Sequence, residues 1–255
     1  MPGEPKSPVA ENAASGKCTA TPEIEIYFVD LVRVAAVVED EEARTPRLSA
    51  ADIERAAAMA DREARGLWRA SRIATRILLE RAGGTDLRRR AFHIEAGGRP
   101  VLDAGSPYFS VSHTNGVALV AVAKAVVIGV DLEAKTRVLR MSAERRRRII
   151  QAAQGLGPQA SLSAEQDGDV LIAWVQLEAA AKALGIGIGR LLTQEGVVGG
   201  SKAKSSPQQR DLEVRSMSVG TDYVGGVAAQ HLPNDLAVKP FPHTQLEAFL
   251  RGKSV

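Results

Sequence analysis

The spacing of hydrophobic residues predicts alternating strands and helices in the first half of the chain. Residues 24–34 (IEIYFVDLVRV) are rich in β-branched and aromatic side chains, which indicates a strand. Between residues 49 and 81, hydrophobic residues recur at helical spacing, and Gly83 and Gly84 then end the pattern. This region is therefore predicted to form one long helix or two helices in tandem.

Three short strands are predicted between residues 108 and 133 (YFSVSHTNGVALVAVAKAVVIGVDLE). The dipeptide Asn115-Gly116 is typical of a two-residue hairpin turn, and Lys124 marks a second turn between runs of β-branched residues. The segment is therefore predicted to form a β-meander, in which each strand pairs with the next.

The second half of the chain shows two helical patterns followed by a strand pair. A basic pattern covers residues 143–153, and an alanine-rich pattern covers residues 171–184. The GIGIG segment at residues 185–189 ends the second helix, because glycine adopts the left-handed conformation that closes helices. Strands are expected around residues 214–230, with Thr221 and Asp222 at the turn.

The two halves resemble each other weakly. VDL occurs at residues 29–31 and 130–132, and SVSHTNGVALVAVA resembles SMSVGTDYVGGVAA. We therefore expect an α+β fold with a disordered arm (1–22), an N-terminal subdomain (23–126) and a C-terminal subdomain (127–250). Each subdomain is expected to be a small, mostly antiparallel sheet packed on a long helix, with a site in the cleft between them.

Composition excludes several classes of protein. The 255 residues are 45% hydrophobic, which excludes collagen-like and disordered chains. The single cysteine, Cys18, cannot form an internal disulfide, and the first residues lack a secretory signal, so we expect a cytoplasmic protein. No segment predicts a membrane span. The net charge of +3 favours acidic or phosphorylated ligands, while an aromatic content of 4% argues against a base-stacking surface for nucleic acid.

Two carboxylates in the last predicted strand of the 108–133 segment form a candidate metal site. Asp131 and Glu133 are two residues apart, so both side chains project from the same face of the strand. Magnesium prefers oxygen ligands and is often bound by one or two carboxylates together with substrate phosphates. The alternative is a solvated outer face of the strand.

Glu178 and Lys182 share one face of the alanine-rich helix, and Trp174 lies one turn earlier on that face. Such a pair is also a common surface ion pair of small energetic value. The surrounding alanines favour a buried helix, which makes a functional pair the preferred interpretation.

Ser112 and His113 directly precede the predicted hairpin turn. Neighbouring residues of a strand point to opposite faces, so these two cannot form a nucleophile and base pair. Their hydroxyl and imidazole groups suit hydrogen bonding to an anion, and ordinary turn chemistry is the alternative. A basic run at residues 145–148 indicates either a solvated helix face or a surface for nucleic acid or for an acidic protein.

The segments GRP (98–100), SVSH (110–113), IGVDLE (128–133) and WVQLEAAAK (174–182) occur in an order that resembles the 4'-phosphopantetheinyl transferases of the type that activates peptide synthetases. The likeness extends over about residues 24–230. It implies a pseudo-dimer of two α/β halves. It also implies magnesium-dependent transfer of the phosphopantetheine arm of coenzyme A to a serine of an apo acyl or peptidyl carrier protein, with release of adenosine 3',5'-bisphosphate.

The resemblance also implies roles for individual residues. Magnesium would be held against the coenzyme A pyrophosphate by Asp131, Glu133 and Glu178. Glu178 would accept the serine proton, Lys182 would stabilise the departing phosphate, and Asp131 completes the implied catalytic set. The positions that match contacts with coenzyme A are Arg76, Gly98, Arg99, Pro100, Ser112, His113, Asp131 and Lys182. Because the cleft is formed within one chain, we expect a monomer.

The chain differs from the family pattern at three places. Leu177 replaces a lysine of the helical motif, and Arg99 replaces the lysine of G-K-P. The sequence RRRRIIQAAQGLG stands where the family has a phenylalanine and acid element that helps to bind the carrier protein. Two alternatives follow: a catalytically impaired relative that binds coenzyme A or carrier protein, and a basic protein that binds nucleic acid.

Overall fold

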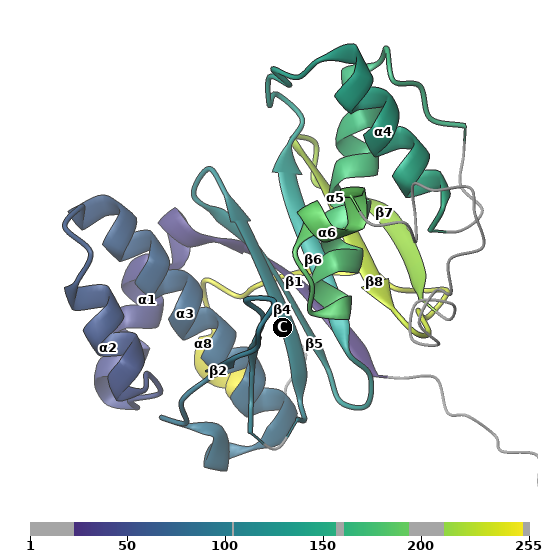
Figure 1. Cartoon of the computed structure of the whole chain (residues 1–255). Helices are drawn as coiled ribbons and strands as arrows, with labels where there is room; N and C mark the ends of the chain where they lie inside the picture. The colour runs from purple at the N-terminus through teal and green to yellow at the C-terminus, as the bar shows by residue number, and fades with distance from the viewer. Residues whose placement is uncertain (1–22, 104, 157–160, 194–211, 252–255) are drawn as a thin grey trace, which may run out of the picture.

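The computed structural model describes residues 23–103, 105–156, 161–193 and 212–251, and the arm predicted at residues 1–22 lies outside them. Within the described residues the fold is mixed α+β, and its three small sheets are mostly antiparallel (Figure 1). None of the described helices is both long and apolar enough to span a membrane.

A four-stranded sheet lies in the middle of the molecule, with strand order β4-β5-β1-β9. Strands β1 and β4 pair antiparallel with β5, whereas β9 runs parallel to β1. The strands are β1 (Ile24–Asp30), β4 (Tyr108–Thr114), β5 (Val117–Ala123) and β9 (Val238–Pro240). The elements beside this sheet are α1 (Leu31–Arg44), α2 (Ala50–Ala57), α3 (Arg62–Gly83), η1 (Thr85–Leu87), β2 (His93–Ile94), β3 (Pro100–Val101) and α8 (Leu246–Leu250).

A three-stranded antiparallel sheet, of order β6-β8-β7, forms the second half of the molecule. Its strands are β6 (Ile128–Ala134), β7 (Glu213–Val219) and β8 (Tyr223–Ala229). The helices of this half are α4 (Ala143–Gln154), α5 (Asp167–Leu184) and α6 (Ile188–Thr193), on the right of Figure 1.

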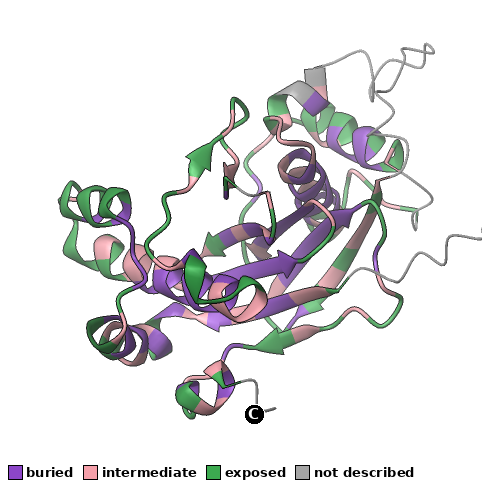
Figure 2. Cartoon of the chain, turned by 90° about the horizontal axis from the view of Figure 1, so that it is seen from below, coloured by how far each residue is buried: buried purple, intermediate pink, exposed green. Residues whose placement is uncertain are grey.

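The hydrophobic core places the two sheets face to face between outer helices. All seven residues of β5 are buried, because Ala118 and Val120 face α3 while Leu119 and Ala121 face the second sheet. On the far side of the second sheet, Val175 of α5 packs in the same cluster as residues of α4 and β8. The layers therefore run helix, sheet, sheet, helix, and Figure 2 shows the buried residues concentrated along the central strands.

The strand predicted at residues 24–34 ends at Asp30, so the prediction was wrong for its last four residues. Asp30 caps α1, and its side chain accepts a hydrogen bond from the backbone N–H of Arg33 at 3.0 Å. Val34 and Val38 then lie on the buried face of α1 at helical spacing. Tertiary packing of these β-branched residues therefore outweighs their preference for a strand.

The predicted β-meander is only half correct. Asn115 and Gly116 form the expected hairpin turn between β4 and β5, with φ values of 47° and 76°. The third strand, β6, pairs with β8 of the second sheet instead of with β5. Both edges of β5 are already occupied by β4 and β1, which leaves β6 no edge in the first sheet.

The remaining element predictions are largely confirmed. Two tandem helices, α2 and α3, cover the region predicted at residues 49–81, and Ser49 with Asp52 forms a capping box at the start of α2. Helix α5 begins four residues earlier than predicted and ends at Gly185, which is left-handed with φ 66°. The predicted last strand pair corresponds to β7 and β8.

After β8 the chain returns to the first half of the molecule. Strand β9 pairs with β1, with Tyr27 opposite Lys239. Phe241, Leu246 and Phe249 then join the core cluster beneath α3. Residues 238–250 therefore belong structurally with the first sheet.

Candidate functional site

Asp131 of β6 is the central residue of the candidate site. Its side chain is buried, with a residue exposure of 6%. Its Oδ1 atom accepts hydrogen bonds from Ser112 Oγ and from Lys182 Nζ, both at 2.8 Å. Its Oδ2 atom is buried and has no hydrogen-bond partner among the described residues. A buried carboxylate oxygen without a donor is rare and indicates a place for a ligand.

The hydrogen bonds around Asp131 connect the two sheets. Strand β6 is an edge strand of the second sheet. The backbone N–H and carbonyl groups of Val130 both form hydrogen bonds with side chains of other elements. Val130 N donates to Ser110 Oγ at 3.0 Å, and Lys182 Nζ donates to Val130 O at 3.0 Å. Ser110 and Ser112 are two residues apart on β4, so both side chains reach β6 from one face.

Two glycines allow α5 to lie close to the second sheet. A side chain at Gly129 would collide with the carbonyl oxygen of Ala179, and a side chain at Gly226 would collide with that of Val175. The close approach brings Glu178 and Lys182, which are one helical turn apart, toward Asp131. The role of these glycines was not predicted from the sequence, although Gly129 stands inside the IGVDLE segment.

Glu178 is partly buried beside Asp131. Burial raises the pKa of the Glu178 carboxyl, the charge of Asp131 raises this pKa further, and Lys182 and Arg137 oppose the increase only in part. Asp131 and Glu178 therefore repel each other, and a cation between them would relieve this repulsion. Their oxygens are the ligands that magnesium prefers, so the donor chemistry of these two residues fits the ion.

Glu133 is held apart from the other two carboxylates. It forms an ion pair with Arg137, whose guanidinium lies 5.8 Å from the ring centroid of Trp174. Within the described residues, no group of three or more His, Cys, Asp or Glu side chains is gathered closely enough to hold a metal ion. A three-carboxylate site of Asp131, Glu133 and Glu178 therefore stays a prediction, and it requires Glu133 to exchange its partner.

His113 follows Ser112 on β4 and lies at the surface. Partial burial lowers the pKa of its imidazole, and the nearby Lys182 ammonium lowers this pKa further. The imidazole is therefore neutral at pH 7, with one N–H available as a donor. This environment agrees with a hydrogen-bonding role toward an anion.

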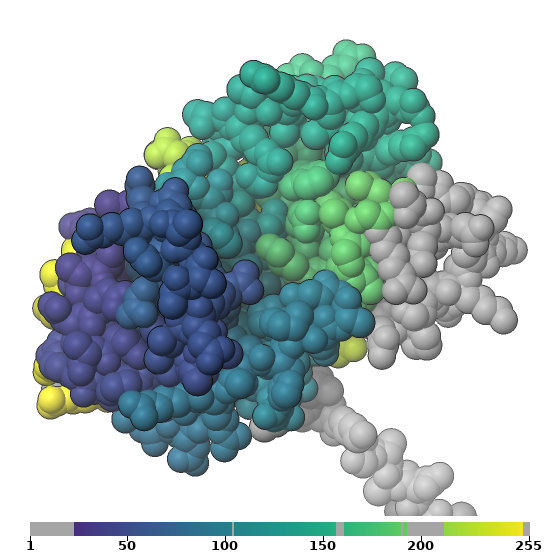
Figure 3. All heavy atoms as spheres, turned by 60° about the vertical axis from the view of Figure 1, so that its left-hand side comes forward, coloured from purple at the N-terminus to yellow at the C-terminus, as the bar shows by residue number. Residues whose placement is uncertain are grey.

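The GRP segment holds the end of α5. Arg99 donates from Nη1 to the carbonyl oxygen of Ala183 at 2.8 Å and from Nε to Glu95 Oε2 at 2.8 Å. Gly98 is left-handed with φ 84°, and Pro100 begins β3. Figure 3 shows the segment around β2 and β3, in blue-teal, against the green surface at the end of α5.

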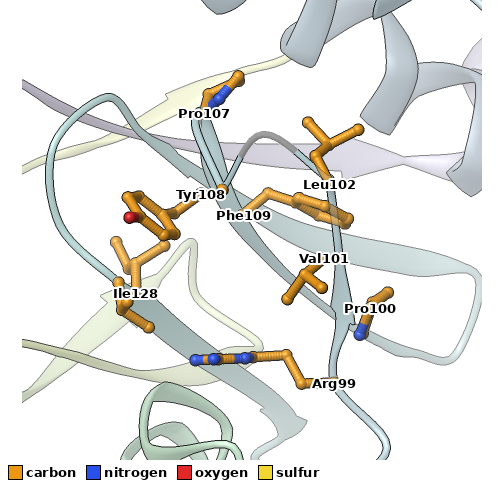
Figure 4. Close-up of a pocket in the computed structure, with 10 residues that line it drawn as sticks. Arg99, Pro100, Val101, Leu102, Pro107, Tyr108, Phe109 and Ile128 are labelled. Carbon is orange, nitrogen blue, oxygen red and sulfur yellow. The ribbon is translucent and has the colours of Figure 1, made fainter. Parts of the chain in front are cut away.

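A cavity beside Arg99 is too small for a coenzyme. Figure 4 shows Arg99, Tyr108 and Ile128 around it, and its volume is about 10 Å³, room for about one water molecule. This cavity therefore adds no binding site for a large ligand.

Arg76 of α3 is committed to helix packing. It is 3% exposed, and its Nε donates to Asp52 Oδ2 at 2.6 Å while its Nη2 donates to Ser49 Oγ at 3.2 Å. The guanidinium also lies 4.4 Å from the ring centroid of Phe92. Among the described residues, these contacts join α2 to α3 and include none of the other predicted site residues.

The structure thus brings together one group of predicted site residues around Asp131: Ser112, Glu178 and Lys182, with His113 and Glu133 at its margin. It places Arg76, Gly98, Arg99 and Pro100 in structural contacts elsewhere. Arg137 was missed, although it stands four residues after Glu133 in the sequence. In comparisons of the sequence, no protein-family model matches this chain and no curated protein is significantly similar to it.

Proposed function

We propose that this chain is a magnesium-dependent 4'-phosphopantetheinyl transferase. The reaction would move the phosphopantetheine arm of coenzyme A to a serine hydroxyl of an apo acyl or peptidyl carrier protein and release adenosine 3',5'-bisphosphate. The observation that carries the proposal is the buried Asp131, which has one unsatisfied oxygen and lies beside Ser112 and Lys182. These three residues come from three of the segments that resemble the family.

Asp131, Glu133 and Glu178 would hold the magnesium ion. When bound, magnesium offsets the negative charge of the pyrophosphate, which otherwise opposes attack at phosphorus. The raised pKa of Glu178 makes its carboxylate a stronger base, suited to accept the proton of the serine hydroxyl.

Lys182 is suited to bind the departing phosphate. An ammonium group has three donors, and two of them go to Val130 O and Asp131 Oδ1 among the described residues. The third donor is available for a phosphate oxygen. Ser112 and His113 would add neutral donors on the β4 side of the same site.

The arrangement of the proposed enzyme is a pseudo-dimer, with the active site in the cleft between its halves. Support comes from the two facing sheets, each with one long helix, α3 or α5, on its outer side. Contacts of Arg76 and Arg99 with coenzyme A would require both guanidinium groups to exchange partners, because each is already paired. We propose a cytoplasmic monomer that uses coenzyme A and a carrier protein as its partners.

A catalytically impaired relative that binds coenzyme A or carrier protein is the second candidate. Leu177 is fully buried in the core beside α4, at the position where the family pattern has a lysine. This chain therefore lacks the lysine of the family pattern, which favours this alternative. In the basic run of α4, Arg146 pairs with Asp167 and Arg148 with Glu144, which favours a solvated helix face over a surface for nucleic acid.

The decisive experiment incubates the protein with coenzyme A, magnesium and a panel of apo carrier proteins. Intact mass spectrometry should detect a phosphopantetheine adduct on at least one carrier. Asp131→Ala and Glu178→Gln should each abolish the adduct, whereas Glu247→Gln on the surface of α8 should leave it unchanged.

The outcomes separate the candidates. Coenzyme A binding without an adduct on any carrier would favour the impaired relative. An absence of both binding and adduct would overturn both proposals. Retained activity in Asp131→Ala or Glu178→Gln would contradict the site assignment.

A further inference from the structure

We infer that Arg137 is an internal counter-ion of Glu133. When a metal ion binds to Glu133, the Arg137 side chain leaves this carboxylate and forms an ion pair with the phosphate of the incoming ligand. This inference rests on the proposed function, because it concerns the same carboxylates.

Arg137 lies directly beside the candidate site. It follows β6 in a turn, where its backbone N–H donates to the carbonyl oxygen of Ala134 at 2.9 Å. Its guanidinium forms the ion pair with Glu133 and lies over the ring of Trp174. Trp174 precedes Glu178 by one turn of α5, so Arg137 lies between the end of β6 and the helix face that carries Glu178.

The charge of Arg137 acts on more than one carboxylate. It opposes the rise in the pKa of Glu178 that burial and Asp131 produce. Lys182 neutralises Asp131 in the same way that Arg137 neutralises Glu133. Both carboxylates of β6 are thus paired with cationic side chains, and a divalent cation must compete with Arg137 for Glu133.

Arg137 is the more exchangeable of the two cations. Its side chain is 42% exposed, and exposed ion pairs contribute little net free energy. The Lys182 ammonium is also held by the backbone of Val130. The ring of Trp174 keeps the released guanidinium near the site, and the planar fork of arginine matches a phosphate better than lysine does.

Titration calorimetry of the full chain with magnesium chloride, and then with inorganic pyrophosphate at saturating magnesium, tests this exchange. Removal of the competing charge in Arg137→Gln should tighten magnesium binding about fivefold, the upper range for an exposed ion pair. The same variant should weaken pyrophosphate binding about tenfold, as expected for the loss of a charge-assisted hydrogen bond.

Two further variants serve as references. Arg137→Lys should restore part of the pyrophosphate affinity, because it keeps the charge and loses the fork. Arg148→Gln removes the ion pair of Arg148 with Glu144 on α4, which has the same four-residue spacing as the pair of Arg137 with Glu133. This variant should change neither the magnesium affinity nor the pyrophosphate affinity.

The opposite directions of the two effects distinguish counter-ion exchange from a structural role. A parallel fall of both affinities in Arg137→Gln, or no change in either, would overturn the inference. In that case magnesium binding by the unaltered chain would leave the proposed function standing. If the unaltered chain binds neither magnesium nor pyrophosphate, the metal site itself fails, and the inference fails with it.

Discussion

At the scale of single residues, two acidic side chains show how a buried charge can serve function or structure. Asp131 has one oxygen with two donors and one oxygen with none among the described residues. An unsatisfied buried acceptor costs about 1–3 kcal/mol, and a ligand that bound to this oxygen would remove that cost. Glu80 is the contrasting case, since Arg47 Nε donates to its Oε2 at 2.6 Å and Arg88 Nε donates at 2.9 Å.

The Glu80 cluster predicts a dependence of stability on pH. Burial raises the pKa of the Glu80 carboxyl, but the hydrogen bonds and charges of Arg88 and Arg47 outweigh burial and leave this pKa lowered. A lowered folded-state pKa gives stability that is present above the ordinary value of 4.5 and is lost as the pH falls through the folded-state value.

We therefore expect Glu80→Gln to lower the free energy of unfolding by about 2 kcal/mol at pH 7, because the buried Arg47 keeps its ion pair with Glu41 but loses the charged acceptor of its Nε. The difference from the unaltered chain should shrink below pH 4.5. Urea unfolding at a series of pH values measures it, and Glu247→Gln on the exposed side of α8 is the control. A difference that stays constant down to low pH would contradict this assignment.

At the scale of elements, the contact between α5 and β6 determines where the candidate site forms. Gly129 has no side chain to separate the strand from the helix backbone at Ala179. Lys182 can therefore reach both Val130 and Asp131 from the next turn of the helix. The distance between these two elements is thus coupled to the hydrogen bonds of the site.

Gly129→Ala should push α5 away from β6. We expect a loss of about 1–3 kcal/mol in the free energy of unfolding, typical of overpacking, together with loss of the Lys182 to Asp131 contact and of the proposed transfer activity. Gly168→Ala is a matched control in the first turn of α5, where an added methyl group meets nothing. It should be neutral or slightly stabilising, because alanine favours a helix. Equal effects of the two changes would contradict the close-packing argument.

The sequence predicted most elements of the fold but not all of their partners. Hydrophobic spacing and the turn at Asn115-Gly116 correctly identified strands and helices, because these signals are local. The sequence did not assign β6 to the second sheet, because strand pairing depends on which strand edges are already occupied.

The same limit applies to the candidate site. Residue spacing placed Asp131 and Glu133 on one strand and Glu178 and Lys182 on one helix face. It did not reveal that Arg137 pairs with Glu133 or that Arg76 pairs with Asp52, because side-chain partners distant in space have no local signal. Motif order therefore predicted the candidate site, and packing decides which of the predicted residues lie together in it.

At the scale of the whole molecule, the chain crosses between its two sheets twice. It leaves the first sheet after β5 and returns to it with β9 and α8. Phe249 of α8 packs in the core with Tyr27 of β1, with ring centroids 5.7 Å apart. The guanidinium of Arg81 in α3 lies 4.2 Å from the ring centroid of Phe249 and donates a hydrogen bond to the carbonyl oxygen of Phe249.

Phe249→Ala should therefore destabilise the first half of the molecule. We expect a loss of about 3–5 kcal/mol, typical of a buried aromatic residue, and faster amide hydrogen exchange in β1 and α3. Exchange in α5, which packs on the other sheet, should change less. Faster exchange confined to α8 would contradict an integral role of this helix in the first sheet.

The return of the chain has a consequence for the order of folding during translation. Strands β1, β4 and β5 leave the ribosome well before residues 238–240 are made. Until then the outer edge of β1 has no partner, and an open strand edge invites pairing with other chains. Most of the first sheet is thus synthesised before the second sheet but is completed after it, and the nascent chain depends on residues 238–240 to protect the edge of β1.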